Sequence, residues 1–160
     1  MSPCPAKQRA ANGEPPRPVD PDRPSDEVLA GILTGARTIA VVGMSDTEGK
    51  AAYSVPRILI EHGWDVVPVN PHHTTVAGLP SYASLAEVPR PIDLVNVFRP
   101  AEETPAIAHE AAAIGAGGIW LQAGIRSDEA REIADAAAIA FVQNACCGAF
   151  ARRNALRPAR

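Results

Sequence analysis

Short apolar runs alternate along this chain with longer segments in which apolar residues recur at helical spacing. The runs predict strands because they are brief, rich in β-branched residues and bounded by glycine, proline or polar residues. The expected strands are Ile39–Val42, Asp65–Val69, Ile92–Phe98, Ile119–Gln122 and Ile139–Val142. Helices are expected at 26–35, 53–62, 102–114 and 128–138, a single helical turn at 84–88, and a loop with a short basic tail after residue 142.

The alternation of strands and helices indicates an α/β fold, since several strands are continuously apolar and so are buried on both faces. It predicts a doubly wound parallel sheet of five strands with helices on both faces. A chain of 160 residues is long enough for one such domain, which we place at residues 25–160. Residues 1–24 are rich in proline and poor in apolar residues, so we expect a disordered tail there.

The segment Thr38–Lys50 is a short strand that ends at a glycine and leads into a helix. Such a turn lets backbone N–H groups approach a phosphate, and the helix N-terminus favours an anion; a tight turn without a ligand is the alternative. Parallel sheets bind ligands at the carboxyl ends of their strands. The residues expected at that edge are Gly43, Met44, Ser45, Asn70, Pro71, Phe98, Arg99, Gln122 and Gly124.

This set of residues lacks the motifs of several common sites. A dinucleotide site needs GxGxxG and an acid after the second strand, but the glycine spacing differs and Asn70 holds the acid's position. The phosphate-binding loop of ATPases is excluded because one residue too many separates the glycines and Ala51 lacks the magnesium-binding hydroxyl. No GxSxG elbow is present. Adjacent His72 and His73 have no companion ligands for a metal, so we expect exposed loop residues or a contact with an anion.

Charge and cysteine content narrow the class of protein further. A formal net charge of -3 argues against a general nucleic-acid binder. No apolar run is long enough to span a bilayer, and no secretory signal is evident. The three cysteines, Cys4, Cys146 and Cys147, form no zinc motif, and the odd count favours a reducing, cytoplasmic setting.

Six blocks of sequence resemble the stand-alone CoA-binding domain family, small bacterial proteins related to the nucleotide-binding domain of the succinyl-CoA synthetase α subunit. The resemblance covers residues 28–142, and each block lies beside a predicted strand end. The blocks are Ile39–Asp46, Lys50–Val55, Gly63–Pro71, Gly78–Leu85, Asp93–Arg99 and Trp120–Ile125.

The resemblance implies a Rossmann-like fold that binds coenzyme A and has no chemistry of its own. Carried onto this chain, it implies that the glycine loop lies against the pyrophosphate and that the second strand borders the adenosine. The residues implied are Gly43, Met44, Ser45, Lys50 and Tyr53 at the loop, Asn70 and Pro71 at the adenosine, Phe98 and Arg99 beside the ligand, and Gln122 toward the pantetheine arm. Trp120 lies within an apolar strand and is expected in the core.

The chain also departs from the family pattern. Lys50 stands where relatives often carry arginine, which keeps the charge but loses the planar fork. After the fifth strand, Asn144–Phe150 replaces a run of Asp-Arg-Cys, and only Cys146 is retained. The alternatives to a simple CoA or acyl-CoA binder are a subunit or fragment of an acyl-CoA ligase-type enzyme and an NAD(H)-responsive regulatory protein. A homodimer through exposed apolar helix faces is a further expectation left open.

Overall fold

The computed structural model describes residues 23–159, so nearly all of the expected N-terminal tail lies outside the described residues. The larger helices are α1 (Asp26–Gly35), α2 (Ala51–Glu61), α3 (Thr104–Ala113), α4 (Asp128–Ala136) and α5 (Cys147–Arg153). Two 3₁₀ turns are η2 (Leu85–Glu87) and η3 (Ala101–Glu103). The strands are β1 (Thr38–Val42), β2 (Asp65–Val69), β3 (Thr75–Val76), β4 (Leu79–Pro80), β5 (Leu94–Val97), β6 (Gly118–Leu121) and β7 (Ala140–Val142).

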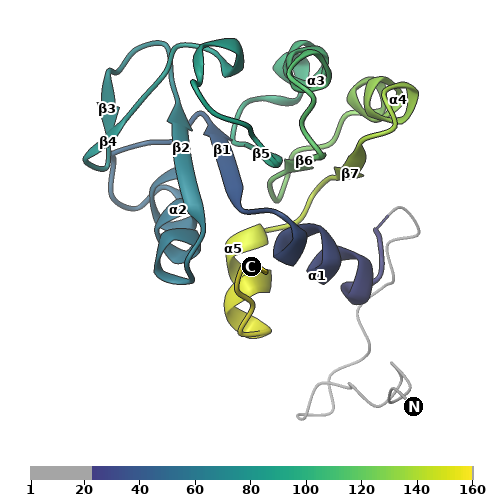
Figure 1. Cartoon of the computed structure of the whole chain (residues 1–160), viewed down its shortest axis with the longest axis horizontal. Helices are drawn as coiled ribbons and strands as arrows, with labels where there is room; N and C mark the ends of the chain where they lie inside the picture. The colour runs from purple at the N-terminus through teal and green to yellow at the C-terminus, as the bar shows by residue number, and fades with distance from the viewer. Residues whose placement is uncertain (1–22, 160) are drawn as a thin grey trace.

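The central sheet has five parallel strands in the order β2-β1-β5-β6-β7. Helices α1, α2 and α5 cover one face of this sheet, and α3 and α4 cover the other (Figure 1). The expected doubly wound α/β fold is therefore confirmed. The direction of winding reverses between β1 and β5, and in such sheets a ligand crevice forms outside the carboxyl ends of the strands at the reversal.

Local sequence explains where the helices begin. Ser25 accepts a hydrogen bond at its Oγ from the Val28 amide, 3.3 Å away, and so caps α1 as expected. Ser127 caps α4 in the same way, through the Ala130 amide at 3.1 Å. Both helices carry acidic residues in their first turn, the favourable sign at the positive end of the helix dipole.

The sequence prediction of a loop after β7 was wrong. Helix α5 forms instead, and the Cys146 sulfur accepts a hydrogen bond from the Ala149 amide at 3.4 Å. Phe150 and Ala151 are buried in the core, where Phe150 packs near Trp120. This helix was not predicted because it has only 7 residues and because a thiol caps it in place of the usual hydroxyl or carboxylate. The small β3–β4 hairpin was also not predicted.

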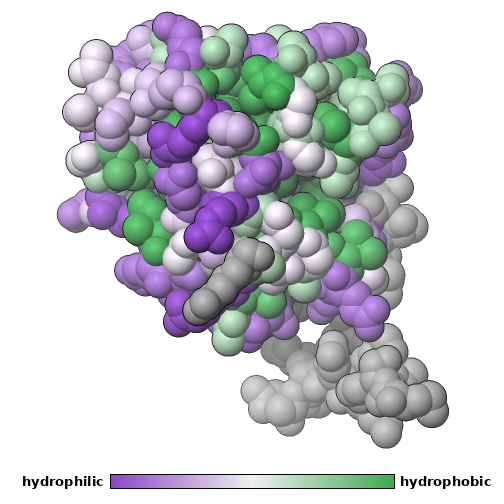
Figure 2. Space-filling model, in the orientation of Figure 1, coloured by the Kyte–Doolittle hydropathy of each residue, from purple (hydrophilic) through white to green (hydrophobic). Residues whose placement is uncertain are grey.

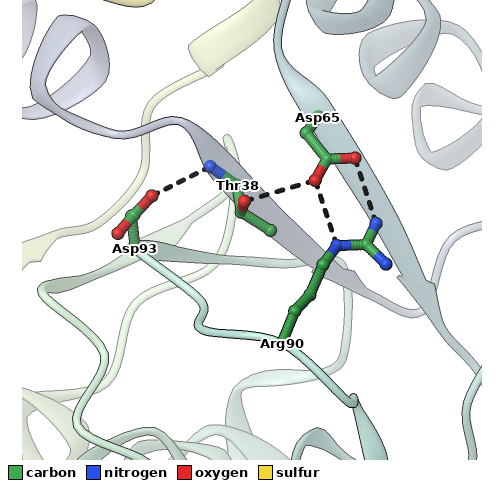
Figure 3. A network of polar contacts seen from close by, with 4 residues as sticks. All are labelled: Thr38, Asp65, Arg90 and Asp93. Atoms are coloured by element: carbon green, nitrogen blue, oxygen red, sulfur yellow. Dashed lines mark hydrogen bonds and ion pairs between the residues drawn. The ribbon is translucent and has the colours of Figure 1, made fainter.

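A polar network ties the amino ends of the strands together (Figure 3). Arg90 donates two hydrogen bonds of 3.0 Å to the Asp65 carboxylate, and the Thr38 hydroxyl donates to the same carboxylate at 3.3 Å. One oxygen of Asp93 accepts the backbone N–H groups of Arg37 and Thr38, at 2.9 and 3.0 Å. The side chains at this edge are thus occupied with one another, at the opposite end of the sheet from the glycine turn.

The surface seen in Figure 2 shows hydrophobic residues in separate patches among hydrophilic ones. Within residues 23–159, no helix has both the length and the apolar content needed to cross a membrane.

Candidate functional site: a cleft at the carboxyl edge of the sheet

A cleft of about 570 Å³ lies at the carboxyl ends of β1, β2 and β5. Its walls come from the turn after β1, the turn after β2, the segment that enters η2, and α3 with the η3 turn before it. The lining segments are residues 42–47, 69–73 and 83–85, together with Lys50, Arg99, Glu103, Ile107 and Glu110. The cleft therefore occupies the place where winding reverses in the sheet.

The glycine turn after β1 is held from both sides. Gly43 has φ of +88°, in the left-handed region that glycine adopts without strain, and its N–H donates to the Val69 carbonyl at 2.9 Å. The Ser45 N–H donates to the Ala52 carbonyl of α2 at 3.0 Å, and the Ser45 hydroxyl accepts the Thr47 amide at 3.0 Å. The turn is therefore fixed against both β2 and α2.

Asn70 joins this turn to the one after β2. Its Nδ2 donates to the Met44 carbonyl at 3.1 Å, and its Oδ1 accepts the His72 amide at 2.9 Å. Its own backbone N–H donates to the Tyr82 carbonyl at 2.9 Å. The side chain at the end of the second strand is thus a strut between two turns of the cleft wall.

Charged side chains of both signs face the cleft. The basic residues are Lys50, His72, His73 and Arg99, and the acidic residues are Asp46, Glu103 and Glu110. The Asp46 carboxylate accepts the Ala77 amide at 2.6 Å. Glu103 accepts two hydrogen bonds from Arg99, 3.1 Å to Nε and 2.8 Å to Nη2.

Most of the site residues expected from sequence meet in this cleft. Those that line it are Gly43, Met44, Ser45, Lys50, Asn70, Pro71 and Arg99. Tyr53, Phe98 and Gln122 do not line it. Tyr53 lies under the Arg57 guanidinium, 4.1 Å from the ring centroid, and Phe98 packs against the core on the α2 side.

Gln122 is buried, only 4% exposed, beside the thiol of Cys147. Asn96 donates to that sulfur at 3.2 Å, while its own Oδ1 has no partner among the described residues. Burial raises the pKa of the Cys147 thiol, and the neighbouring Cys146 raises it further against weaker opposing hydrogen bonds. The buried thiol therefore stays protonated near neutral pH and is a poor nucleophile.

The wall formed by α3 was missed from sequence. Glu103 ends η3, and Ile107 and Glu110 of α3 follow it at spacings of four and three residues, the spacing of one helix face. This spacing is a signal that could have found them once the preceding strand was known to end at the site. On the opposite face of the sheet Trp120 is fully buried, as expected, and its Nε1 donates to the Ala145 carbonyl at 2.8 Å.

Within the described part of the chain, no three His, Cys, Asp or Glu residues gather closely enough to hold an ion. His72 and His73 are both exposed at the cleft mouth.

The strand order and the glycine-turn cleft define a Rossmann-like α/β protein with a ligand crevice at the reversal of the sheet. Comparison with known families agrees: the model of the CoA binding domain family matches residues 37–152, and the chain belongs to that family.

Relatives of known sequence or structure share most of this domain. Uncharacterized protein YneT of Bacillus subtilis (strain 168) is 36% identical over 110 residues, which cover 69% of this chain and 82% of YneT. The structure of a hypothetical protein from Pyrococcus horikoshii OT3 has a TM-score of 0.80 and 35% identity, with 88% of this chain and 97% of that chain covered. An ADP-forming acetate–CoA ligase of Methanocaldococcus jannaschii is 29% identical over 82 residues, which are 51% of this chain but 12% of the ligase.

Proposed function

We propose that this protein binds coenzyme A or an acyl-CoA in the cleft at the carboxyl edge of the sheet, without chemistry of its own. The observation that carries the proposal is the position of that cleft. It opens where the winding of the sheet reverses, is bounded by a glycine turn and contains Lys50 and Arg99. Membership of the CoA binding domain family supports the same ligand.

The residues present fit the chemistry of coenzyme A. Its pyrophosphate and 3′-phosphate call for cations and hydrogen-bond donors, and Lys50 and Arg99 are the side chains in the cleft that can supply both. The cleft volume of about 570 Å³ is within the range of small-molecule sites, which runs from about 300 to 1,000 Å³. Tyr53, Phe98 and Gln122 do not line the cleft and are given no contact with the ligand in this proposal.

Ligand-induced thermal stabilisation tests the proposal directly. A ligand that binds only the folded state at about 100 times its Kd adds about 2.7 kcal/mol of stability. Coenzyme A is expected to raise the melting temperature, and NAD at equal concentration is not. Equal shifts with both compounds, or none with either, would rule the proposal out.

A matched pair of variants locates the binding. Lys50→Ala removes an exposed cation from the cleft and is expected to reduce the shift caused by coenzyme A. Arg152→Ala removes an exposed cation of α5 that does not line the cleft, and it is expected to leave the shift unchanged. Equal effects of the two substitutions would show that binding depends on overall charge and not on this cleft.

A second candidate is a CoA-binding subunit of an acyl-CoA ligase-type enzyme. It is favoured by the similarity to acetate–CoA ligases, of which the aligned part is only 12% in one case and 11% in another. The remaining ligase functions would then come from a separate polypeptide. CoA-dependent acyl-CoA formation that appears only on addition of such a polypeptide would favour this candidate.

A further inference from the structure

We propose that Glu103 lowers and sets the affinity of the cleft by competing with the ligand's phosphates for Arg99. The inference rests on the proposed function and assigns Glu103, a residue that sequence reasoning did not select, as a determinant of ligand affinity. The three residues that carry it are Gly43, Arg99 and Glu103, which meet at the junction of β1, β5 and η3.

The first observation is the ion pair itself. Both oxygens of Glu103 are used, Oε1 at 3.1 Å from Nε and Oε2 at 2.8 Å from Nη2 of Arg99. This is the two-bond geometry that a phosphate group would also adopt with a guanidinium. The carboxylate therefore occupies the edge of Arg99 that suits a phosphate best.

The second observation is where the Arg99 side chain lies. A Cβ built on Gly43 would be 2.9 Å from Arg99 Cδ, 3.2 Å from the Phe98 carbonyl oxygen and 3.4 Å from Arg99 Cγ. The missing side chain of Gly43 thus lets the Arg99 stem pack against the glycine turn. Arg99 is therefore held beside the turn, and its guanidinium is held by Glu103.

The third observation is that the pair is exposed. The side chains of Arg99 and Glu103 are 45% and 47% exposed, and ion pairs of this kind are weak because water and salt compete with them. A ligand phosphate, with greater negative charge, can therefore replace the carboxylate. The weak pair reduces affinity modestly without closing the cleft.

Glu110 provides a matched comparison on the same wall. It also lines the cleft and carries the same charge, but it has no ion pair among the described residues. Glu110→Gln removes a negative charge from the cleft without releasing an arginine. The two glutamates thus separate simple charge repulsion from competition for Arg99.

The experiment is calorimetric titration of coenzyme A into the wild-type protein, E103Q, E110Q, R99Q and the R99Q/E103Q double variant at low salt. E103Q is expected to bind about fivefold more tightly than the wild type, the upper range for an exposed ion pair, and E110Q less than about twofold more tightly. In the R99Q background the gain from E103Q should shrink to the size seen with E110Q. The gain should also fall at about 1 M salt, where charges are screened within about 3 Å.

Two results would overturn the inference while the proposed function stands. Weaker binding by E103Q would show that Glu103 holds Arg99 in place for the ligand. A gain that persists at full size in R99Q would show direct repulsion between Glu103 and the ligand. A wild-type protein that binds no coenzyme A would refute the proposed function, and the inference with it.

Discussion

Helix α5 contacts α2 so closely that one methyl group added at the contact should lower the stability of the protein. A Cβ built on Gly148 would be 2.9 Å from Val55 Cγ1, 3.3 Å from the Val55 carbonyl oxygen and 3.4 Å from its Cα. Valine in a helix is nearly fixed in one rotamer, and the other two atoms belong to the backbone. Val55 therefore cannot move away from the added methyl group without a cost in free energy. Overpacking of this kind costs about 1–3 kcal/mol. Gly148→Ala should therefore lower the unfolding free energy by about 1–2 kcal/mol, after a small gain in helix propensity.

Chemical denaturation and thermal melting measure this effect, and the chain supplies its own control. Gly31 lies inside α1 with nothing within 4 Å of its added Cβ, so Gly31→Ala should stabilise by about 0.5–1 kcal/mol. Val55→Ala alone should cost about 2 kcal/mol through a cavity, but in the Gly148→Ala background it should cost at least about 1 kcal/mol less. A Gly148→Ala protein as stable as the wild type, or additive costs in the double variant, would refute the close packing of α5 on α2.

Three further changes test other parts of the structure. Asn70→Asp removes the donor to the Met44 carbonyl and should reduce the unfolding free energy by about 1 kcal/mol in urea titrations. Because burial raises the pKa of the folded Cys147 thiol, its contribution to stability is complete below about pH 8.5 and declines as the pH rises above that; Cys147→Ala should remove this part of the slope between about pH 8.5 and 10. Trp120→Phe leaves the Ala145 carbonyl without its partner and opens a cavity, so denaturation should show a loss of about 2–4 kcal/mol.

For each of these substitutions, one result would contradict the expected effect. An Asn70→Asp protein of unchanged stability would mean that the strut between the two turns is dispensable. A wild-type pH slope that matches that of Cys147→Ala would mean that the thiol is not shielded from water. A loss below about 1 kcal/mol for Trp120→Phe would place this ring in a looser environment than its full burial indicates.

The layers of the fold could be predicted because the relevant patterns are local. Continuous apolar runs such as Ile119–Leu121 are buried on both faces, and this requires helices above and below the sheet. Serine caps fixed the starts of α1 and α4. Helix α5 escaped prediction because its stability comes from contacts distant in sequence, such as that of Gly148 with Val55, and not from propensity or a strong cap.

Some residues of the candidate site could also be predicted from the sequence, and others could not. Gly43, Ser45 and Asn70 follow strands directly, so the topology rule alone brings them to one edge. Tyr53 was expected in the cleft but turns to the Arg57 guanidinium, a choice of helix face that short segments do not determine. Spacing along the chain could have suggested Glu103 as a lining residue, but its ion pair with Arg99 is seen only when the side chains are placed.

The cleft is lined by both charged and apolar side chains, and under the proposed function the two kinds contact different parts of the ligand. Lys50 and Arg99 are the cations, while Ile107 of α3 and Leu85 of η2 belong to the core cluster on that side. A ligand that carries phosphates and a flat, largely apolar base can use both kinds of contact. Inorganic pyrophosphate can use only the charged ones. An adenine nucleotide that carries the same pyrophosphate should therefore bind more tightly than pyrophosphate itself, and Ile107→Ala should reduce that advantage while leaving pyrophosphate affinity unchanged. An undiminished advantage in the variant would place the base elsewhere.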